Sequence, residues 1–271
     1  AEHPRRRGRR RVIPLHDLLP TRRTPWATYA LLVLNIAAYV WSVLRPEQVW
    51  RFVGEPGRVR VPGFDATVIQ YGFVPCELAR SCTADVVRDV ALSGGGSADV
   101  AVPHVPVALT LLTAMFLHGG LVHLGGNMLF LWIFGNNVED AMGRLRFLAF
   151  YLLGGGAASV AQVVVDHGSR VPNVGASGAI AAVLGAYLVL FPRARVLCLI
   201  PPMRLPAVIP LVLWIVLQLR AGAASLGGQI EVQGGGVAYW AHIGGFAVGM
   251  LLVGRFVRER RRWDGRTYVW A

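Results

Sequence analysis

The chain alternates between long apolar runs and short polar connections. Six runs contain no Asp, Glu or Arg, and they lie at 27–44, 120–138, 147–165, 176–191, 205–219 and 237–254. A bilayer core about 30 Å thick is crossed by about 20 apolar helical residues, and a helix satisfies its own backbone polar groups there. We therefore expect an all-α polytopic membrane protein with six transmembrane helices, several of them extending past the short runs.

The composition supports a membrane protein. Of 271 residues, 54% are hydrophobic and only 15% are charged, whereas soluble domains carry about 25% charged residues. The net charge is +12, and every basic residue is Arg. These residues gather at the termini and in the connections, which suits the bilayer as a partner better than nucleic acid.

The Arg distribution predicts an orientation. Eight Arg precede the first run and six follow the last, so the positive-inside rule places both termini in the cytoplasm. The first run is long enough to span, so we expect no cleaved signal peptide. We expect a basic segment at 1–24, a membrane domain at 25–258 with a long outer loop at 45–107, and a basic tail at 259–271. The Arg-only usage suggests a bacterium with a GC-rich genome, and together with the apolar runs we expect a multi-pass protein of its plasma membrane.

The outer loop contains two of the three cysteines, Cys76 and Cys82. They form a disulfide if this face is oxidising. Two unpaired thiols are the alternative, and the sequence leaves that choice open.

Polar groups inside a membrane are costly and mark functional sites. Here they are His118, His123 and Asn127 at the second run, Ser177 at the fourth and His242 in the sixth. These three runs cross in the same direction, so their polar groups meet at one level near the outer face. A Ser hydroxyl becomes a nucleophile when a base takes its proton, and His is that base near neutral pH.

The start of the fourth run supplies stabilisation for an oxyanion. A helix N-terminus leaves backbone N–H groups free, and preorganised donors stabilise the developing charge. Ser177 and His242 then form a dyad, because no carboxylate lies in the runs to orient the imidazole. We expect neither a metal nor a cofactor.

Small residues predict close helix packing between the fourth and sixth runs. The sixth run has the stripe Ala241, Gly245 and Gly249 at four-residue spacing, which lets backbones approach. The fourth run is rich in Gly and Ala, starting with Gly178.

Five motifs in order resemble the rhomboid family of intramembrane proteases, and the likeness extends from Thr24 to Arg258. They are Thr-Pro-Trp-Ala-Thr-Tyr-Ala-Leu from Thr24, His118 with His123-x-x-x-Asn127, Glu-Asp-Ala-Met-Gly-Arg from Glu139, Gly175-Ala-Ser177-Gly178, and Ala241-His242-Ile-Gly-Gly245 with Gly249.

The resemblance implies a six-helix bundle in which Ser177 cleaves membrane-protein substrates, single-span or polytopic, in or near a membrane segment. The Ser177 N–H and the side chains of His118 and Asn127 would hold the oxyanion near the extracytoplasmic face. His123 would support the hole by helix packing or hydrogen bonding, and Gly175 and Gly178, on either side of Ser177, would also support it. The segment at 45–107 would be a partly embedded loop beside the site.

The chain departs from the family pattern at two places. Many relatives have Trp-Arg where this chain has Leu109-Thr110. That pair supports the structure of the outer loop, so the difference affects the expected loop and not the dyad. Some relatives stack an aromatic residue on the catalytic His from the position of Ala181. What orients His242 is therefore open.

Three other functions compete with proteolysis. A catalytically silent rhomboid-like chaperone or trafficking factor is the main alternative, although such proteins usually lose the Ser or the His. A metal site built from His118, His123 and His242 is disfavoured, because no His-Glu-x-x-His motif and no membrane carboxylate accompany it. An aspartyl protease is excluded by the absence of Asp from the runs. The substrate and the oligomeric state are not encoded.

Overall fold

Six long helices dominate the computed structural model, which describes residues 19–52, 56–82, 86–91, 97–103, 105–199, 202–226, 237–259, 261–265 and 268–270. Each corresponds to one of the apolar runs, so the mostly helical prediction is confirmed. The helices are α1 (Trp26–Leu44), α5 (Leu121–Met142), α6 (Arg144–Val165), α7 (Ser177–Leu190), α8 (Val208–Leu226) and α9 (Tyr239–Phe256).

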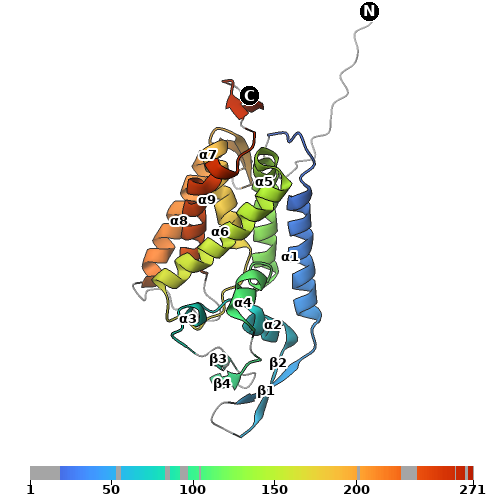
Figure 1. Cartoon of the computed structure of the whole chain (residues 1–271), viewed down its shortest axis with the longest axis vertical. Helices are drawn as coiled ribbons and strands as arrows, with labels where there is room; N and C mark the ends of the chain where they lie inside the picture. Colours follow the sequence, from blue (N-terminus) through green and yellow to red (C-terminus); the bar gives the residue numbers. More distant parts are fainter. Residues whose placement is uncertain are drawn as a thin grey trace, which may run out of the picture.

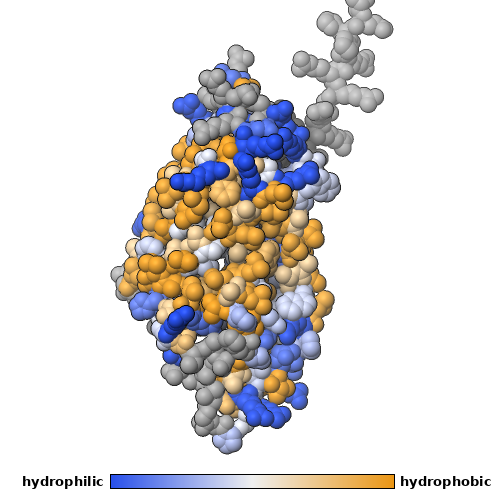
Figure 2. Space-filling view, in the orientation of Figure 1, coloured by the Kyte–Doolittle hydropathy of each residue, from blue (hydrophilic) through white to orange (hydrophobic). Residues whose placement is uncertain are grey.

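Three of these helices are long and apolar enough to cross a membrane among the residues that the structure describes. They are α1, α6 and α8, while α7 is apolar but has only 14 residues. Helix length and composition therefore do not confirm the predicted number of six transmembrane helices. On the face drawn in Figure 2, apolar side chains form a broad band across the middle of the bundle, with hydrophilic side chains at both ends.

The segment between α1 and α5 is not all-α, so that part of the fold prediction is wrong. A four-stranded antiparallel sheet of order β2-β1-β4-β3 lies here, at one end of the bundle (Figure 1). It has its own small core around Trp50, Val61 and Val100. The elements are β1 (Gln48–Phe52), β2 (Arg58–Val61), α2 (Gly63–Tyr71), α3 (Pro75–Leu78), β3 (Val86–Ala91), β4 (Ser97–Ala101) and α4 (Val107–Thr113).

Two antiparallel hairpins complete the described elements. One pairs β5 (Arg195–Leu199) with β6 (Pro202–Pro206) between α7 and α8, and the other pairs β7 (Arg261–Trp263) with β8 (Tyr268–Trp270). The second hairpin and the start of α1 lie opposite the sheet (Figure 1). We call that end the terminal end and the end with the sheet the loop end.

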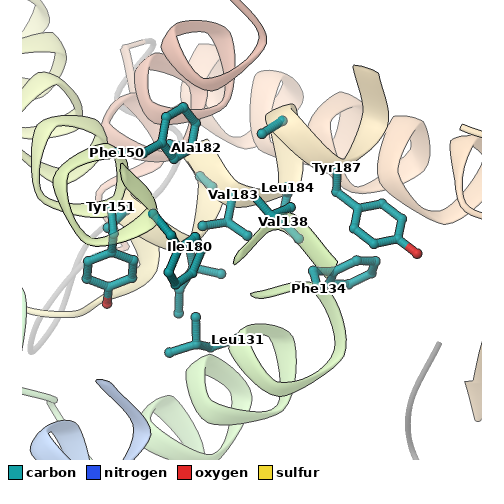
Figure 3. Close-up of a cluster of buried hydrophobic side chains, with 14 of the residues drawn as sticks. Leu131, Phe134, Val138, Phe150, Tyr151, Ile180, Ala182, Val183, Leu184 and Tyr187 are labelled. Atoms are coloured by element: carbon teal, nitrogen blue, oxygen red, sulfur yellow. The ribbon is translucent and has the colours of Figure 1, made fainter. Parts of the chain in front are cut away.

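Helix α7 is the centre of the bundle. It packs against α5, α6, α8 and α9, and nearly all its side chains after Ser177 are buried up to Tyr187. Figure 3 shows Ile180, Val183 and Leu184 of α7 between side chains of α5 and α6. A helix enclosed on all sides must be apolar all round, which explains why its sequence shows no polar face.

Glycines bring α9 onto α7 without an intervening side chain. A Cβ at Gly245 would overlap the Gly178 carbonyl, and one at Gly249 would overlap the Ala182 carbonyl. Gly178 itself faces Ala158 of α6, where a Cβ would come within 2.6 Å of the alanine methyl. This contact sets the distance between the helices that carry Ser177 and His242.

Two buried carboxylates stabilise the terminal end. Glu139 accepts hydrogen bonds from the Ala27 and Thr28 backbone N–H groups and from the Thr28 hydroxyl, at 2.7–3.0 Å. It thereby caps the first turn of α1, which has no side-chain cap of its own. Asp140 accepts from the Arg22 N–H and pairs with Arg261, each at 2.7 Å.

A disulfide stabilises the loop end beside the site. Cys76 and Cys82 are bonded, which answers the question that the sequence left open. The Cys76 N–H donates to the Ser169 carbonyl at 3.0 Å, and Phe73 pairs with Asn173 in an isolated β-bridge. The segment that leads into Ser177 is thus docked against the segment between α2 and α3.

Candidate active site

Ser177 is the first residue of α7 and follows a turn that only glycine tolerates. Gly175 has φ +130°, and a Cβ there would lie 2.8 Å from His123 Cε1 and Nε2 and 3.4 Å from Ser177 Oγ. Its N–H donates to the Ala114 carbonyl at 2.8 Å. The backbone conformation and the lack of space both require Gly175, which holds the serine at the helix N-terminus close to His123.

His242 comes from α9 and reaches Ser177 directly. Its Nε2 lies 2.7 Å from Ser177 Oγ, and its side chain is 9% exposed. His242 is in the first turn of α9 and Ser177 in the first turn of α7, where the glycine contact brings the two helices together. The structure thus brings the expected nucleophile and base within hydrogen-bond distance.

The second nitrogen of His242 has a partner that was not expected from the sequence. Gln218 of α8 places Oε1 2.8 Å from His242 Nδ1. A carbonyl oxygen only accepts, so Nδ1 carries the proton and Nε2 is left to accept the serine proton. That tautomer is the one a general base needs.

An aromatic ring also supports the imidazole. Trp214, one turn before Gln218 on α8, lies with its ring centroid 5.8 Å from that of His242 and an interplanar angle of 35°. It is inclined against Phe246 as well, at 6.0 Å. The position of Ala181 lacks an aromatic side chain, and α8 provides one instead. The sequence held one sign of these two supporting residues. Trp214 and Gln218 are an aromatic and a polar residue four positions apart in an otherwise apolar run, so they share one face of the helix.

Two histidines near α5 differ in their ring partners. His123 Nδ1 accepts the Gly119 N–H at 3.3 Å, so its proton is on Nε2, the atom beside Gly175. His118 Nδ1 lies 3.3 Å from the Phe116 carbonyl, so its proton is on Nδ1 and its buried Nε2 has none to donate. The structure therefore does not place His118 as the expected oxyanion donor.

Asn127 lies one helical turn after His123, on the same face of α5. Its side chain is 7% exposed, and within the described part of the chain its Nδ2 is buried without a hydrogen-bond partner. A buried amide group without a partner is costly unless a ligand satisfies it. Its donor is therefore free for a group that is bound at the site.

A narrow cavity opens at Ser177. Its volume is about 40 Å³, and small side chains line it, including Gly155, Ala158, Gly178 and Ala241. The Ala241 N–H at its edge donates to Gln162 Oε1 of α6 at 3.3 Å. This space is large enough for a water molecule and too small for a large side chain.

The described residues include no cluster of three or more His, Cys, Asp or Glu side chains that could hold a metal ion. His118 and His123 are adjacent, with ring centroids 5.2 Å apart, but His242 uses both nitrogens on Gln218 and Ser177. Both ring nitrogens of His242 therefore have partners within the protein.

Residues 107–259, more than half of the chain, match the family model of the Rhomboid domain, so the chain belongs to the rhomboid family. It is 30% identical over 152 residues to Rhomboid protein 1, mitochondrial, of Saccharomyces cerevisiae, covering 55% of this chain and 42% of that protein. It is 47% identical over 78 residues to Rhomboid protease GluP of Bacillus subtilis, covering 29% and 15%.

A third relative is the human presenilin-associated rhomboid-like protein, mitochondrial, 35% identical over 95 residues, or 34% of this chain and 25% of that protein. The matches cover less than half the length of these relatives. They also correct the expected location: the prediction of a bacterial plasma membrane is contradicted, because several relatives are mitochondrial rhomboid proteins of eukaryotes.

Proposed function

We propose that the protein is an intramembrane serine endopeptidase with Ser177 as nucleophile and His242 as general base. The observation that carries the proposal is the 2.7 Å contact between His242 Nε2 and Ser177 Oγ. Gln218 fixes the tautomer in which that nitrogen accepts a proton. A rhomboid relative that served only as a scaffold would have no need of this arrangement.

The oxyanion is held by three donors in this proposal. The first is the Ser177 backbone N–H at the start of α7, where the helix dipole also favours negative charge. The second is His123 Nε2–H beside Gly175, and the third is the Asn127 amide, which has no partner in the described structure. The roles that the family resemblance gave to His118 and His123 are thereby exchanged.

The reaction follows from these positions. His242 takes the proton of Ser177 as Oγ attacks the scissile carbonyl carbon, whose oxygen becomes the oxyanion. His242 then gives the proton to the leaving amine as the C–N bond breaks and an acyl-serine remains. Water, deprotonated by His242, attacks that ester and releases the carboxyl product and free Ser177.

The substrates are membrane proteins with one or several spans, cut in or beside a membrane segment. The cavity lined by Gly155, Ala158 and Ala241 accommodates a small side chain at the cleaved bond. In this proposal all six long helices cross the bilayer. Helix α7, with only 14 residues, does so as the inner helix, enclosed by α5, α6, α8 and α9.

Labelling with a fluorophosphonate tests the proposal, because this reagent reacts only with an activated serine. The full chain in detergent should be labelled, Ser177→Ala should lose the label, and His242→Ala should lose most of it. Ser42→Ala is the matched control, because the Ser42 hydroxyl donates to the Tyr39 carbonyl of its own helix and, among the described residues, to no other group. Cleavage of a single-span substrate should follow the same order. A wild-type chain that remains unlabelled, or equal labelling of all variants, would indicate the catalytically silent alternative.

A further inference from the structure

A second pocket lies at the terminal end, away from Ser177. It has a volume of about 550 Å³ and lies between the start of α1, the joint of α5 with α6, and the residues after α9. Four arginines line it: Arg23, Arg144, Arg146 and Arg258. Figure 2 shows hydrophilic side chains gathered at this end, next to the apolar band.

Among the described residues, the two acidic residues of the pocket form no ion pair with these four arginines. Glu139 is used by the first turn of α1, and Asp140 is paired with Arg261. Within the described part of the chain, Arg23 pairs with Glu259 at 2.7 Å, whereas Arg144, Arg146 and Arg258 form no ion pair. Three guanidinium groups in or beside the pocket therefore have no ion-pair partner among the described residues.

The backbone adds to the positive potential. Helix α6 begins at Arg144 directly after Gly143, which has φ +81°, and has no side-chain cap and no acidic residue in its first turn. Its first N–H groups and its dipole favour an anion. Gly143 lines the pocket, so this helix end and the arginines belong to one site.

The lining of the pocket also includes an apolar side chain between two of the arginines. Leu145, between Arg144 and Arg146, lines the pocket and is 82% exposed. An exposed leucine side chain would not contribute to binding a free anion from water. The combination of guanidinium groups, a helix N-terminus and an exposed leucine at the edge of the apolar band fits a molecule with an anionic phosphate joined to an acyl chain.

We propose that this pocket binds the phosphate headgroup of an anionic phospholipid. Arg144, Arg146 and Arg258 contact the phosphate, and Leu145 lies against the glycerol and upper acyl chain. Basic pockets between membrane helices bind such headgroups. The proposal is independent of proteolysis, since none of these residues touches Ser177 or His242.

Native mass spectrometry of the full chain in detergent tests the site, with phosphatidylglycerol, phosphatidylcholine and inorganic phosphate as probes. The wild type should bind phosphatidylglycerol in preference to phosphatidylcholine. The double variant Arg144→Gln/Arg146→Gln should weaken this binding roughly tenfold to thirtyfold, since each basic residue near a membrane surface contributes about fivefold. Arg258→Gln, on a different segment, should weaken it about fivefold.

The matched control removes the same charge at the other end of the molecule. Arg58→Gln/Arg60→Gln changes two exposed arginines of β2 and should leave phosphatidylglycerol binding unchanged. An equal loss in both double variants would mean attraction to net charge only and would overturn the proposal. Competition by inorganic phosphate as effective as that by phosphatidylglycerol would overturn the lipid assignment.

Discussion

Gln218 gives the imidazole of His242 the orientation that a carboxylate provides in many serine proteases. It is a positioning residue, because it touches His242 and not the serine. In the proposed reaction, a neutral amide stabilises the imidazolium less than a carboxylate would, but it fixes the same tautomer. It also costs less to bury than a charge in a membrane.

The variant Gln218→Leu should lower kcat by roughly tenfold to a hundredfold, the range expected for losing about 1.5–3 kcal/mol of hydrogen bonding. KM should change little, because the amide does not contact the substrate. Gln218→Glu keeps an acceptor at the same distance and should retain most of the activity. Steady-state cleavage of a single-span substrate measures both variants. Equal activity of Gln218→Leu and the wild type would show that the bond is incidental.

The two histidines near α5 should respond differently to substitution. His123→Ala removes an oxyanion donor, so kcat should fall by about a hundredfold or more. His118→Ala should lower stability, because it empties a buried site, while the kcat of the folded fraction falls much less. Active-site titration with fluorophosphonate corrects for the folded fraction. A larger kcat loss in His118→Ala would restore the role that the family resemblance first gave to that residue.

The sequence predicted Ser177 and His242 but not their support. Intramembrane polar residues are few, so a Ser and a His at matching depths are conspicuous. Gln218 lies in a run whose lipid-facing and protein-facing residues are both apolar. The sequence of α8 therefore has no hydrophobic periodicity that would show which of its faces points to the site. The tautomers of His118 and His123 depend on backbone groups at Phe116 and Gly119, which no side-chain motif encodes.

At the scale of elements, the contact between α7 and α9 determines the site geometry. Gly249 lies two turns after His242 and rests on the Ala182 carbonyl. Any side chain at Gly249 pushes the helices apart. Because α7 is packed on its other faces by α5 and α6, the displacement would be taken up by α9 and His242.

Gly249→Ala should therefore destabilise the protein by about 1–3 kcal/mol, as overpacking does, and should reduce fluorophosphonate labelling as well. Gly254→Ala is the control on the same helix, since a Cβ there meets nothing within 4 Å. It should be neutral or slightly stabilising, because alanine favours helix by about 1 kcal/mol over glycine. Thermal unfolding in detergent compares the two variants.

Glu139 joins two elements that are far apart in sequence. Glu139→Ala leaves the Ala27 and Thr28 N–H groups buried without acceptors and should cost about 2–4 kcal/mol of unfolding free energy. Glu47→Ala should change the unfolding free energy by less than about 0.5 kcal/mol, because that carboxylate is exposed and its ion pair with Arg60 is long, at 3.8 Å. Denaturant unfolding followed by tryptophan fluorescence gives both values. Similar losses in the two variants would contradict the capping role.

At the scale of the whole molecule, the two ends have different structures. The terminal end has buried carboxylates and an arginine-lined pocket, whereas the loop end has the sheet, the disulfide and Ser177. The six helices were predictable because a long uncharged apolar run has few stable alternatives to a helix. The sheet was not, because its strands have four to six residues and are paired across a long loop.

The turn at Gly175 has a consequence for how relatives of this chain vary. The glycine is required partly because the His123 ring occupies the space where a Cβ would be. A residue other than glycine at this position is compatible only with a smaller or displaced residue at the position of His123. Among aligned rhomboid sequences, the two positions should therefore change together, and relatives that have lost both should be those that no longer cleave peptide bonds.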